Sequence, residues 1–105
     1  MIAVIGRVRT DAERREALVA IGQRVTAASR AEAGCGSYRL YQDTEDPDEF
    51  VFVEEWDNDE ALRQHFRTPH IAEFMRAIPE AIAAPPDVKF HEVARTRDLS
   101  EVGAG

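Results

Sequence analysis

A single cysteine, Cys35, occurs in the 105 residues of this chain. No intramolecular disulfide can form, which fits the reducing conditions of the cytoplasm. Long hydrophobic runs are also missing, because no segment approaches the roughly 18 apolar residues that span a bilayer. The first residues, MIAVIGR, lack the basic region of a signal peptide. We therefore expect a cytoplasmic protein without membrane contacts.

Basic residues are scarce relative to acidic ones. The chain has 13 Lys and Arg against 20 Asp and Glu, for a net charge of −7 and a pI of about 4.9. This balance argues against nucleic acid or an anionic membrane as a partner. Ten acidic residues fall between Asp43 and Glu60, a window without Lys or Arg. We interpret it as a solvated hairpin and helix start, since the ligand spacing of an EF-hand is missing.

Familiar site motifs are absent as well. The chain contains no G-x-G-x-x-G, P-loop, H-E-x-x-H or C-x-x-C pattern, which argues against nucleotide binding and structural zinc. What is present is an ordinary globular composition, 44% hydrophobic and 31% charged. A chain of this length buries roughly 65% of its unfolded surface, enough for one core and therefore one domain.

Residue alternation predicts four strands, at residues 2–9, 35–43, 50–56 and 88–95. The acidic turn around Pro47 joins the second and third strands and is short enough to imply an antiparallel hairpin. A long helix follows the first strand, with Thr10 or Asp11 as its cap and Gly34 as a left-handed cap at its end.

Two short helices are expected between the third and fourth strands. Asp57 or Asn58 caps the first of them, and Thr68 caps the second, with Pro69 at the first helical position. His65 falls on the apolar arc of the first short helix.

The third strand has apolar side chains on both faces. Phe50, Phe52 and Trp56 share one face, whereas Val51 and Val53 share the other. Such a strand belongs to a sheet that is covered on both sides. The chain supplies helices for one side only, so we predict a homodimer in which a second copy covers the other side.

The order strand, helix, strand, strand, helices, strand predicts an α+β fold. We expect a ferredoxin-like sandwich, an antiparallel four-stranded sheet with helices on one face. Residues 1–95 would form this domain and residues 96–105 a flexible C-terminal tail. Dimerisation through the bare sheet face would close two sheets into a barrel.

Several strings of the sequence occur together in a recognisable order. Residues 32–38 read E-A-G-C-G-S-Y, residues 54–56 fit E-x-W, and residues 60–70 fit E-A-L-x-x-H-F-x-T-P-H. In this order the chain resembles the antibiotic biosynthesis monooxygenase family over residues 1 to about 95. The resemblance implies a dimeric α+β barrel with a cavity between sheet and helices. Well-studied members oxygenate aromatic polyketides, phenols or quinols without flavin, haem or metal, whereas others degrade haem or act as isomerases.

The sequence departs from two subgroups of that family. The polyketide oxygenases typically carry Asn and Trp at the positions of Ala61 and His65. Haem-degrading members carry Trp at the position of His65 and an iron-binding His near Met75. What remains is similar to the quinol-oxidising branch, which implies a cofactor-independent monooxygenase that takes a small quinol or phenol and O₂.

His65 is the best candidate for the catalytic base of such a reaction. Its unperturbed pKa lies near ~6.5, and deprotonating a phenol raises the power of that phenol to reduce O₂. The alternatives are a buried histidine bonded to a backbone carbonyl and a residue that only stabilises the helix. A metal site of His65 and His70 is not expected, because the break at Thr68-Pro69 spoils their spacing and no third ligand is evident.

Five further residues are candidates for binding the substrate. They are His70, Tyr38, Trp56, Phe66 and Phe74, although aromatic residues at such positions often form plain core. Glu54 could have a raised pKa, but an ion pair with Arg39 or Arg7 is the simpler expectation. Cys35 is most simply a small buried residue.

Three functions remain open from the sequence. The first is the cofactor-independent oxygenase. The second is an isomerase or lyase that uses the same histidine and dry pocket. The third is a dimer that binds a small ligand without turnover.

Overall fold

Four strands form one antiparallel sheet in the computed structural model, which describes residues 1–103. The strands are β1 (Ile2–Arg9), β2 (Cys35–Gln42), β3 (Glu49–Trp56) and β4 (Asp87–Glu92), in the spatial order β2-β3-β1-β4. β2 and β3 form the predicted antiparallel hairpin, in which Leu40 lies opposite Phe52. The predicted strands are confirmed with small shifts at their ends, and β4 is three residues shorter than expected at its end.

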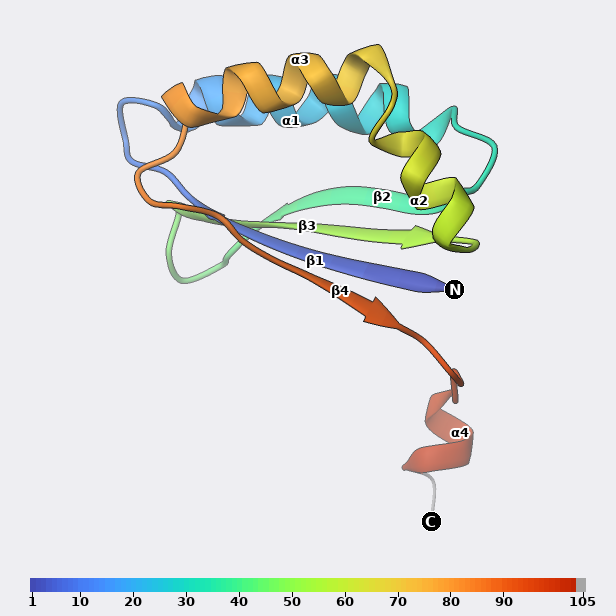
Figure 1. Cartoon of the computed structure of the whole chain (residues 1–105). Coiled ribbons are helices and arrows are strands. Elements are labelled where there is room, and N and C mark those ends of the chain that lie inside the picture. The colour runs from blue at the N-terminus through green and yellow to red at the C-terminus, as the bar shows by residue number, and fades with distance from the viewer. Residues whose placement is uncertain (104–105) are drawn as a thin grey trace.

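Helices cover one face of this sheet. The long helix α1 (Arg15–Arg30) and the shorter α3 (Pro69–Ala77) run side by side above it, and α2 (Asp59–His65) lies at one end (Figure 1). A short 3₁₀ turn, η1 (Ile78–Glu80), leads from α3 back to the sheet. This is the predicted ferredoxin-like α+β fold. Within residues 1–103, no helix is long and apolar enough to cross a membrane.

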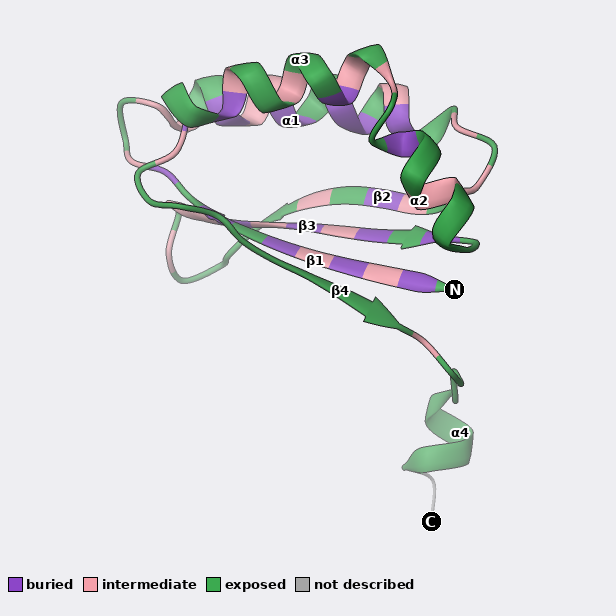
Figure 2. Ribbon diagram, in the orientation of Figure 1, coloured by how far each residue is buried: buried purple, intermediate pink, exposed green. Residues whose placement is uncertain are grey.

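The core lies between the sheet and the helices. Phe50, Phe52, Glu54 and Trp56 of β3 all point into it, and the alternating burial of β1 and β3 is visible in Figure 2. The opposite face of the sheet carries no helix among residues 1–103, and Val53 on that face is only half-buried. The dimer that would cover this face stays a prediction.

The start of α1 differs from the prediction. Thr10 is buried and donates its hydroxyl to the Ala81 carbonyl at 2.7 Å, so it fastens the chain to the turn after η1. Asp11 accepts the backbone N–H of Arg14 at 3.0 Å, and the helix begins only at Arg15. Asp11 therefore stabilises a turn that precedes the helix. Thr10 does not cap the helix, because its hydroxyl is bonded to Ala81.

Gly34 does not form the predicted left-handed cap. The helix ends at Arg30, and no described glycine has a positive φ. A β-carbon on Gly34 would instead collide with the β-carbon of Ala61 in α2. Gly34 is needed for the close approach of α2, not for a turn.

The two short helices begin as predicted. Asn58 caps α2 by accepting the Ala61 N–H, and Thr68 caps α3 by accepting the Ile71 N–H, with Pro69 at the first position. The Asp57–Glu60 capping box that the sequence also allowed is not used, because Asn58 takes the cap position.

The C-terminal segment carries a short helix, α4 (Leu99–Val102), which projects beyond the end of β4 (Figure 1). A capping box of Asp98 and Glu101 closes its first turn. Leu99 and Val102 are exposed, at 82% and 61%, so this helix packs little apolar surface. That residues 96–105 form a flexible tail stays a prediction, and residues 104–105 of that tail lie outside the described residues.

Candidate functional site

A cavity of about 150 Å³ lies between the sheet, α2 and α3. A cavity of that size lined by apolar side chains can hold a single aromatic ring. Its lining side chains are apolar except for three, Tyr38, Glu54 and His65. The half-exposed side chains of Phe66, Met75, Val88 and Phe90 also line the cavity and form its mouth.

His65 is the last residue of α2 and lies almost fully buried, at 2% exposed. Its ring packs against the Trp56 ring with centroids 4.4 Å apart and against the Tyr38 ring at 5.8 Å. The Thr68 hydroxyl donates to the His65 carbonyl at 2.7 Å, which ends the helix at this residue. The predicted inward position of His65 is therefore what the structure shows.

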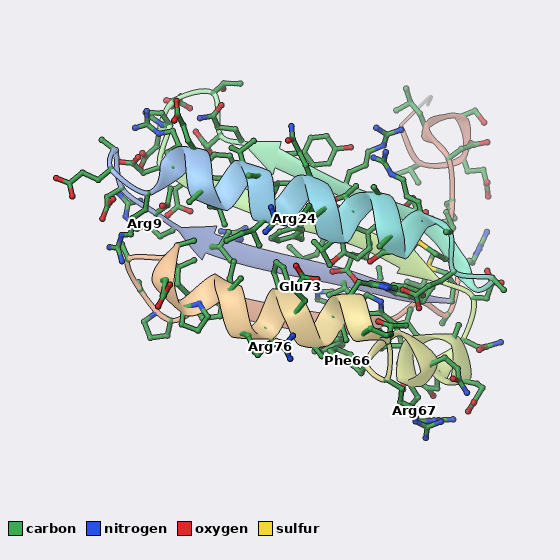
Figure 3. All side chains as sticks on the ribbon, turned by 90° about the horizontal axis from the view of Figure 1, so that it is seen from above. Arg9, Arg24, Phe66, Arg67, Glu73 and Arg76 are labelled. Atoms are coloured by element: carbon green, nitrogen blue, oxygen red, sulfur yellow. The ribbon has the colours of Figure 1, made fainter. Side chains whose placement is uncertain are left out.

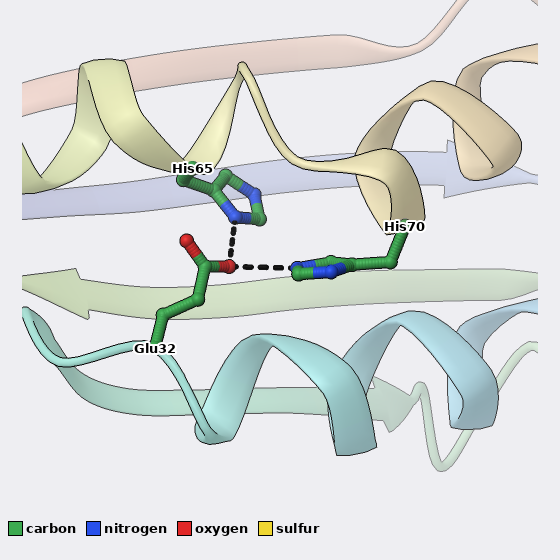
Figure 4. Close-up of side chains that lie close together, drawn as sticks. All are labelled: Glu32, His65 and His70. Carbon is green, nitrogen blue, oxygen red and sulfur yellow. Dashed lines mark hydrogen bonds and ion pairs between the residues drawn. The ribbon is translucent and has the colours of Figure 1, made fainter.

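Glu32 joins the two histidines of this region. Its Oε2 lies 2.7 Å from His65 Nδ1 and 2.8 Å from His70 Nε2, as Figure 4 shows. As a carboxylate Glu32 can only accept, so both ring nitrogens donate to it. These charge-assisted hydrogen bonds are shorter and stronger than bonds between neutral groups.

The bond to Glu32 decides which nitrogen of His65 is free. With the proton on Nδ1, the neutral ring presents an unprotonated Nε2 as the nitrogen available to a ligand in the cavity. Burial lowers the pKa of His65, and the hydrogen bond and charge of Glu32 partly oppose that shift. The ring is thus kept neutral and oriented, which are the properties of a general base.

Glu54 is a second titratable group in the cavity wall. Burial raises its pKa to about 7, while hydrogen bonding from Trp56 and Tyr38 acts in the opposite direction. Its Oε1 accepts the Trp56 indole N–H at 2.9 Å. The expected ion pair with Arg39 or Arg7 is wrong: no Arg or Lys of residues 1–103 pairs with Glu54, because it faces the apolar side of the sheet.

Tyr38 lies directly opposite Glu54 on β2 and is buried, at 2% exposed. Burial raises the pKa of its phenol, so the hydroxyl keeps its proton at neutral pH. A protonated hydroxyl can donate to a substrate oxygen or accept from it.

The structure brings four of the predicted site residues together around the cavity. His65, Tyr38, Phe66 and Phe74 all line it. Trp56 does not; it is fully buried behind His65 and Glu54 and holds both in place. His70 does not line the cavity either, and instead reaches Glu32.

Glu32 is the residue that sequence reasoning missed. It lies in the loop after α1, 33 residues before His65. No local pattern marks it, apart from its place in the E-A-G-C-G string. Cys35, by contrast, is free and half-buried, and burial raises the pKa of its thiol, which lowers the fraction of nucleophilic thiolate.

Three potential metal ligands also meet here. The ring nitrogens of His65 and His70 and a carboxylate oxygen of Glu32 lie within 4.8 Å of one another. The sequence argument against such a site assumed that no third ligand was available, and Glu32 removes that assumption.

The fold and the cavity together define a class of protein. A ferredoxin-like α+β domain that encloses a small, mostly apolar cavity with an oriented histidine is a scaffold for small-molecule chemistry. Comparison with known proteins identifies the family within this class. The sequence model of the family described as antibiotic biosynthesis monooxygenase matches residues 1–77. The chain belongs to this family.

Individual relatives agree with that assignment. An uncharacterised Synechocystis protein, sll1783, is 36% identical over 93% of this chain and 67% of its own length. YcnE of Bacillus subtilis, which carries a provisional monooxygenase name, is 31% identical over 84% of this chain and 93% of its own length. The structure of Rv0793 from Mycobacterium tuberculosis superposes with a TM-score of 0.86 at 29% identity, covering 92% of this chain and 98% of that one.

Proposed function

We propose that this chain is a monooxygenase that needs no resident cofactor and acts on a small phenol or quinol. His65 is its base. The observation that carries the proposal is the bond between Glu32 and His65 Nδ1, which leaves Nε2 as the free nitrogen of a ring that lines the cavity. Membership of the monooxygenase family supports the reaction class.

The reaction begins with proton transfer. His65 Nε2 takes the proton of the substrate hydroxyl, and Glu32 stabilises the imidazolium that forms. Tyr38 donates a hydrogen bond to the phenolate oxygen. The phenolate is a stronger electron donor than the phenol, so it can pass one electron to O₂.

Oxygen transfer then balances without an external reductant. The phenoxyl radical and superoxide combine at a ring carbon, and the imidazolium of His65 protonates the resulting peroxide. Loss of water, made from the ring hydrogen and the hydroxyl of the peroxide, leaves a quinone. The sum is one phenol bearing a ring hydrogen and one O₂ giving one quinone and one water.

The cavity suits this chemistry in size and polarity. Its volume of about 150 Å³ accommodates one ring. Its apolar walls exclude water, which strengthens the hydrogen bonds of the three polar groups and protects the radical pair.

Oxygen uptake on a panel of substituted phenols and hydroquinones tests the proposal. We expect uptake by the parent and a fall of about 10²–10⁴-fold in His65→Ala, the range typical of a general base. His91→Ala is the matched control, because His91 lies exposed on β4 away from the cavity. Equal rates for parent and His65→Ala would remove His65 from the mechanism, and no uptake on any substrate would remove the oxygenase.

A second candidate function rests on Glu54. The same cavity holds a carboxyl group with a pKa of about 7 and a neutral histidine. Such a pair can serve as the acid and the base of an isomerase. One group would remove a proton next to a carbonyl while the other protonates the oxygen. Turnover of a carbonyl substrate under strict anaerobiosis would favour this reaction over oxygenation.

The assembly we propose for either reaction is a homodimer. The sheet face opposite the helices is uncovered among residues 1–103, and it carries Ile5, Val51 and Val53, which are only half-buried. A second copy on this face would cover these side chains and complete the barrel.

A further inference from the structure

The cluster of Glu32, His65 and His70 can do more than orient a base. Its ligand atoms come from three separate segments, the loop after α1, the end of α2 and the first turn of α3. Two imidazoles and one carboxylate form a donor set that suits zinc and other divalent transition metals. We propose that these residues bind such an ion, and that the ion moves the proton of His65 from Nδ1 to Nε2.

The helix break between the histidines makes the site possible. Thr68 fixes the end of α2 through the His65 carbonyl at 2.7 Å and caps α3 through the Ile71 N–H at 3.3 Å. Pro69 restarts the chain in a new direction. His70 therefore turns back toward His65, and both rings reach one oxygen of Glu32, as Figure 4 shows.

Small movements of Glu32 and of the two imidazole rings make room for the ion. Tetrahedral ligands that lie about 2.0–2.1 Å from zinc are roughly 3.3 Å from one another. The carboxylate oxygen is now 2.7 and 2.8 Å from the two nitrogens, so it has to withdraw by about half an ångström. The two nitrogens lie within 4.8 Å of each other and have to reach the same separation of roughly 3.3 Å. Glu32 lies in a loop, and among residues 1–103 its side chain bonds only these two rings.

Charge and access also favour a cation. No Arg or Lys of the described residues is paired with Glu32, so an ion displaces no resident positive charge. The side chains of His70 and Glu32 are 23% and 14% exposed, whereas that of His65 is 2% exposed. An ion can therefore reach the cluster from the side of Glu32 and His70. The helical face of the molecule is seen from above in Figure 3, where Arg24 of α1 and Glu73 of α3 lie close together.

Coordination reverses the tautomer of His65. A metal on Nδ1 takes the place of the proton there, and the neutral ring then carries its proton on Nε2. The nitrogen that faces a cavity ligand changes from acceptor to donor. If the proposed oxygenase function holds, the ion thereby switches off the base, and this last consequence alone rests on that function.

Metal titration of the full chain tests the site without any substrate. Metal-free protein is titrated with Co²⁺ by visible absorption and with Zn²⁺ by calorimetry. We expect one ion per chain, and binding at least about tenfold weaker in Glu32→Gln and His70→Ala, because each variant removes one of three ligands. Circular dichroism verifies that both variants fold.

Two further variants identify binding elsewhere. His91→Ala removes the remaining histidine, and Cys35→Ser removes the thiol; neither should change the affinity. No saturable binding by the parent, or equal affinity in Glu32→Gln and the parent, would overturn the site. A loss of binding confined to His91→Ala or Cys35→Ser would overturn it as well.

Nitrogen-15 NMR of the imidazoles tests the tautomer change. We expect the His65 proton on Nδ1 in metal-free protein and on Nε2 after one equivalent of Zn²⁺. An unchanged Nδ1 proton with zinc bound would contradict the second half of the proposal. Zinc binding with no oxygen uptake on any substrate would leave the site intact and remove only the proposed function.

Discussion

Glu54 in the cavity wall differs from the apolar core residues around it because its side chain can carry a charge. Glu54 is 8% exposed and accepts one hydrogen bond from Trp56, with no basic partner among residues 1–103. Burying a carboxylate without a cation costs free energy, which is why burial raises its pKa to about 7. A group that changes charge near neutral pH is suited to proton transfer, at a cost in stability.

The pH dependence of unfolding should show that cost. Below pH 4.5, the ordinary value for this group, Glu54 is neutral in both states. Between pH 4.5 and about 7 only the unfolded state loses the proton, so the free energy of unfolding falls as pH rises, by about 3 kcal/mol in total. Glu54→Gln, which keeps an acceptor for Trp56, should lack this fall.

Denaturant titrations of both proteins across this pH range measure the effect. The difference between their free energies of unfolding isolates Glu54, since the other titrating groups are common to both. Glu55→Gln, one residue away on the opposite, exposed side of β3, is the matched control and should follow the parent. Parallel curves for Glu54→Gln and the parent would mean that Glu54 titrates normally.

At the scale of elements, the contact between the loop before β2 and α2 positions the site. Gly34 lies against Ala61, and its carbonyl accepts the Asp57 N–H at 2.9 Å, just before α2 begins. This contact sets where α2 lies, and α2 carries His65. The same loop carries Glu32, so one junction aligns both partners of the bond.

Gly34→Ala should push α2 away from the sheet. The added methyl overlaps the β-carbon of Ala61 and lies 3.3 Å from its α-carbon, and such overpacking typically costs about 1–3 kcal/mol. Gly36→Ala is the control, since the nearest atom to its new methyl, the Glu55 carbonyl oxygen, is 3.4 Å away. Thermal and denaturant unfolding measure both variants.

A compensating substitution sharpens this test. In Gly34→Ala combined with Ala61→Gly, the lost methyl of Ala61 restores space, so the double variant should be more stable than the sum of the single effects predicts. Strict additivity would show that the two residues do not touch in solution.

At the scale of the whole molecule, the sheet is covered on one face only. The helices all lie on one side of the sheet (Figure 1). Phe52 is buried on that side, whereas Val53 and its cross-strand neighbour Ile5 face the uncovered side and are half-buried. Strands that carry apolar side chains on both faces are typical of a sheet that is buried on both sides. A second copy with the same exposed face is the simplest cover.

We expect the chain to run as a dimer of twice 11.8 kDa in size-exclusion chromatography with light scattering. Val53→Lys places a charge at the centre of the open face and should shift the protein to monomer. Ala31→Lys, which adds a charge at the exposed end of α1 on the helical side, should leave the dimer intact. A monomeric parent, or a dimer that survives Val53→Lys, would contradict assembly through this face.

Most elements and their layering can be predicted from the sequence, although the start of α1, the role of Gly34 and the helix α4 cannot. Alternation in β1 and β3, the caps at Asn58 and Thr68, and the inward position of His65 all follow from neighbours within a few residues. Such signals are local, so they can be read before the chain is folded.

The partners of the site residues and their charge states depend on tertiary packing. Glu32 meets histidines that are 33 and 38 residues away, Gly34 makes room for Ala61, and Glu54 finds an indole where an arginine was expected. Hydrogen-bond partners, burial and the pKa shifts they cause depend on which distant segments pack together. No local pattern records that packing, because it is set by the whole core.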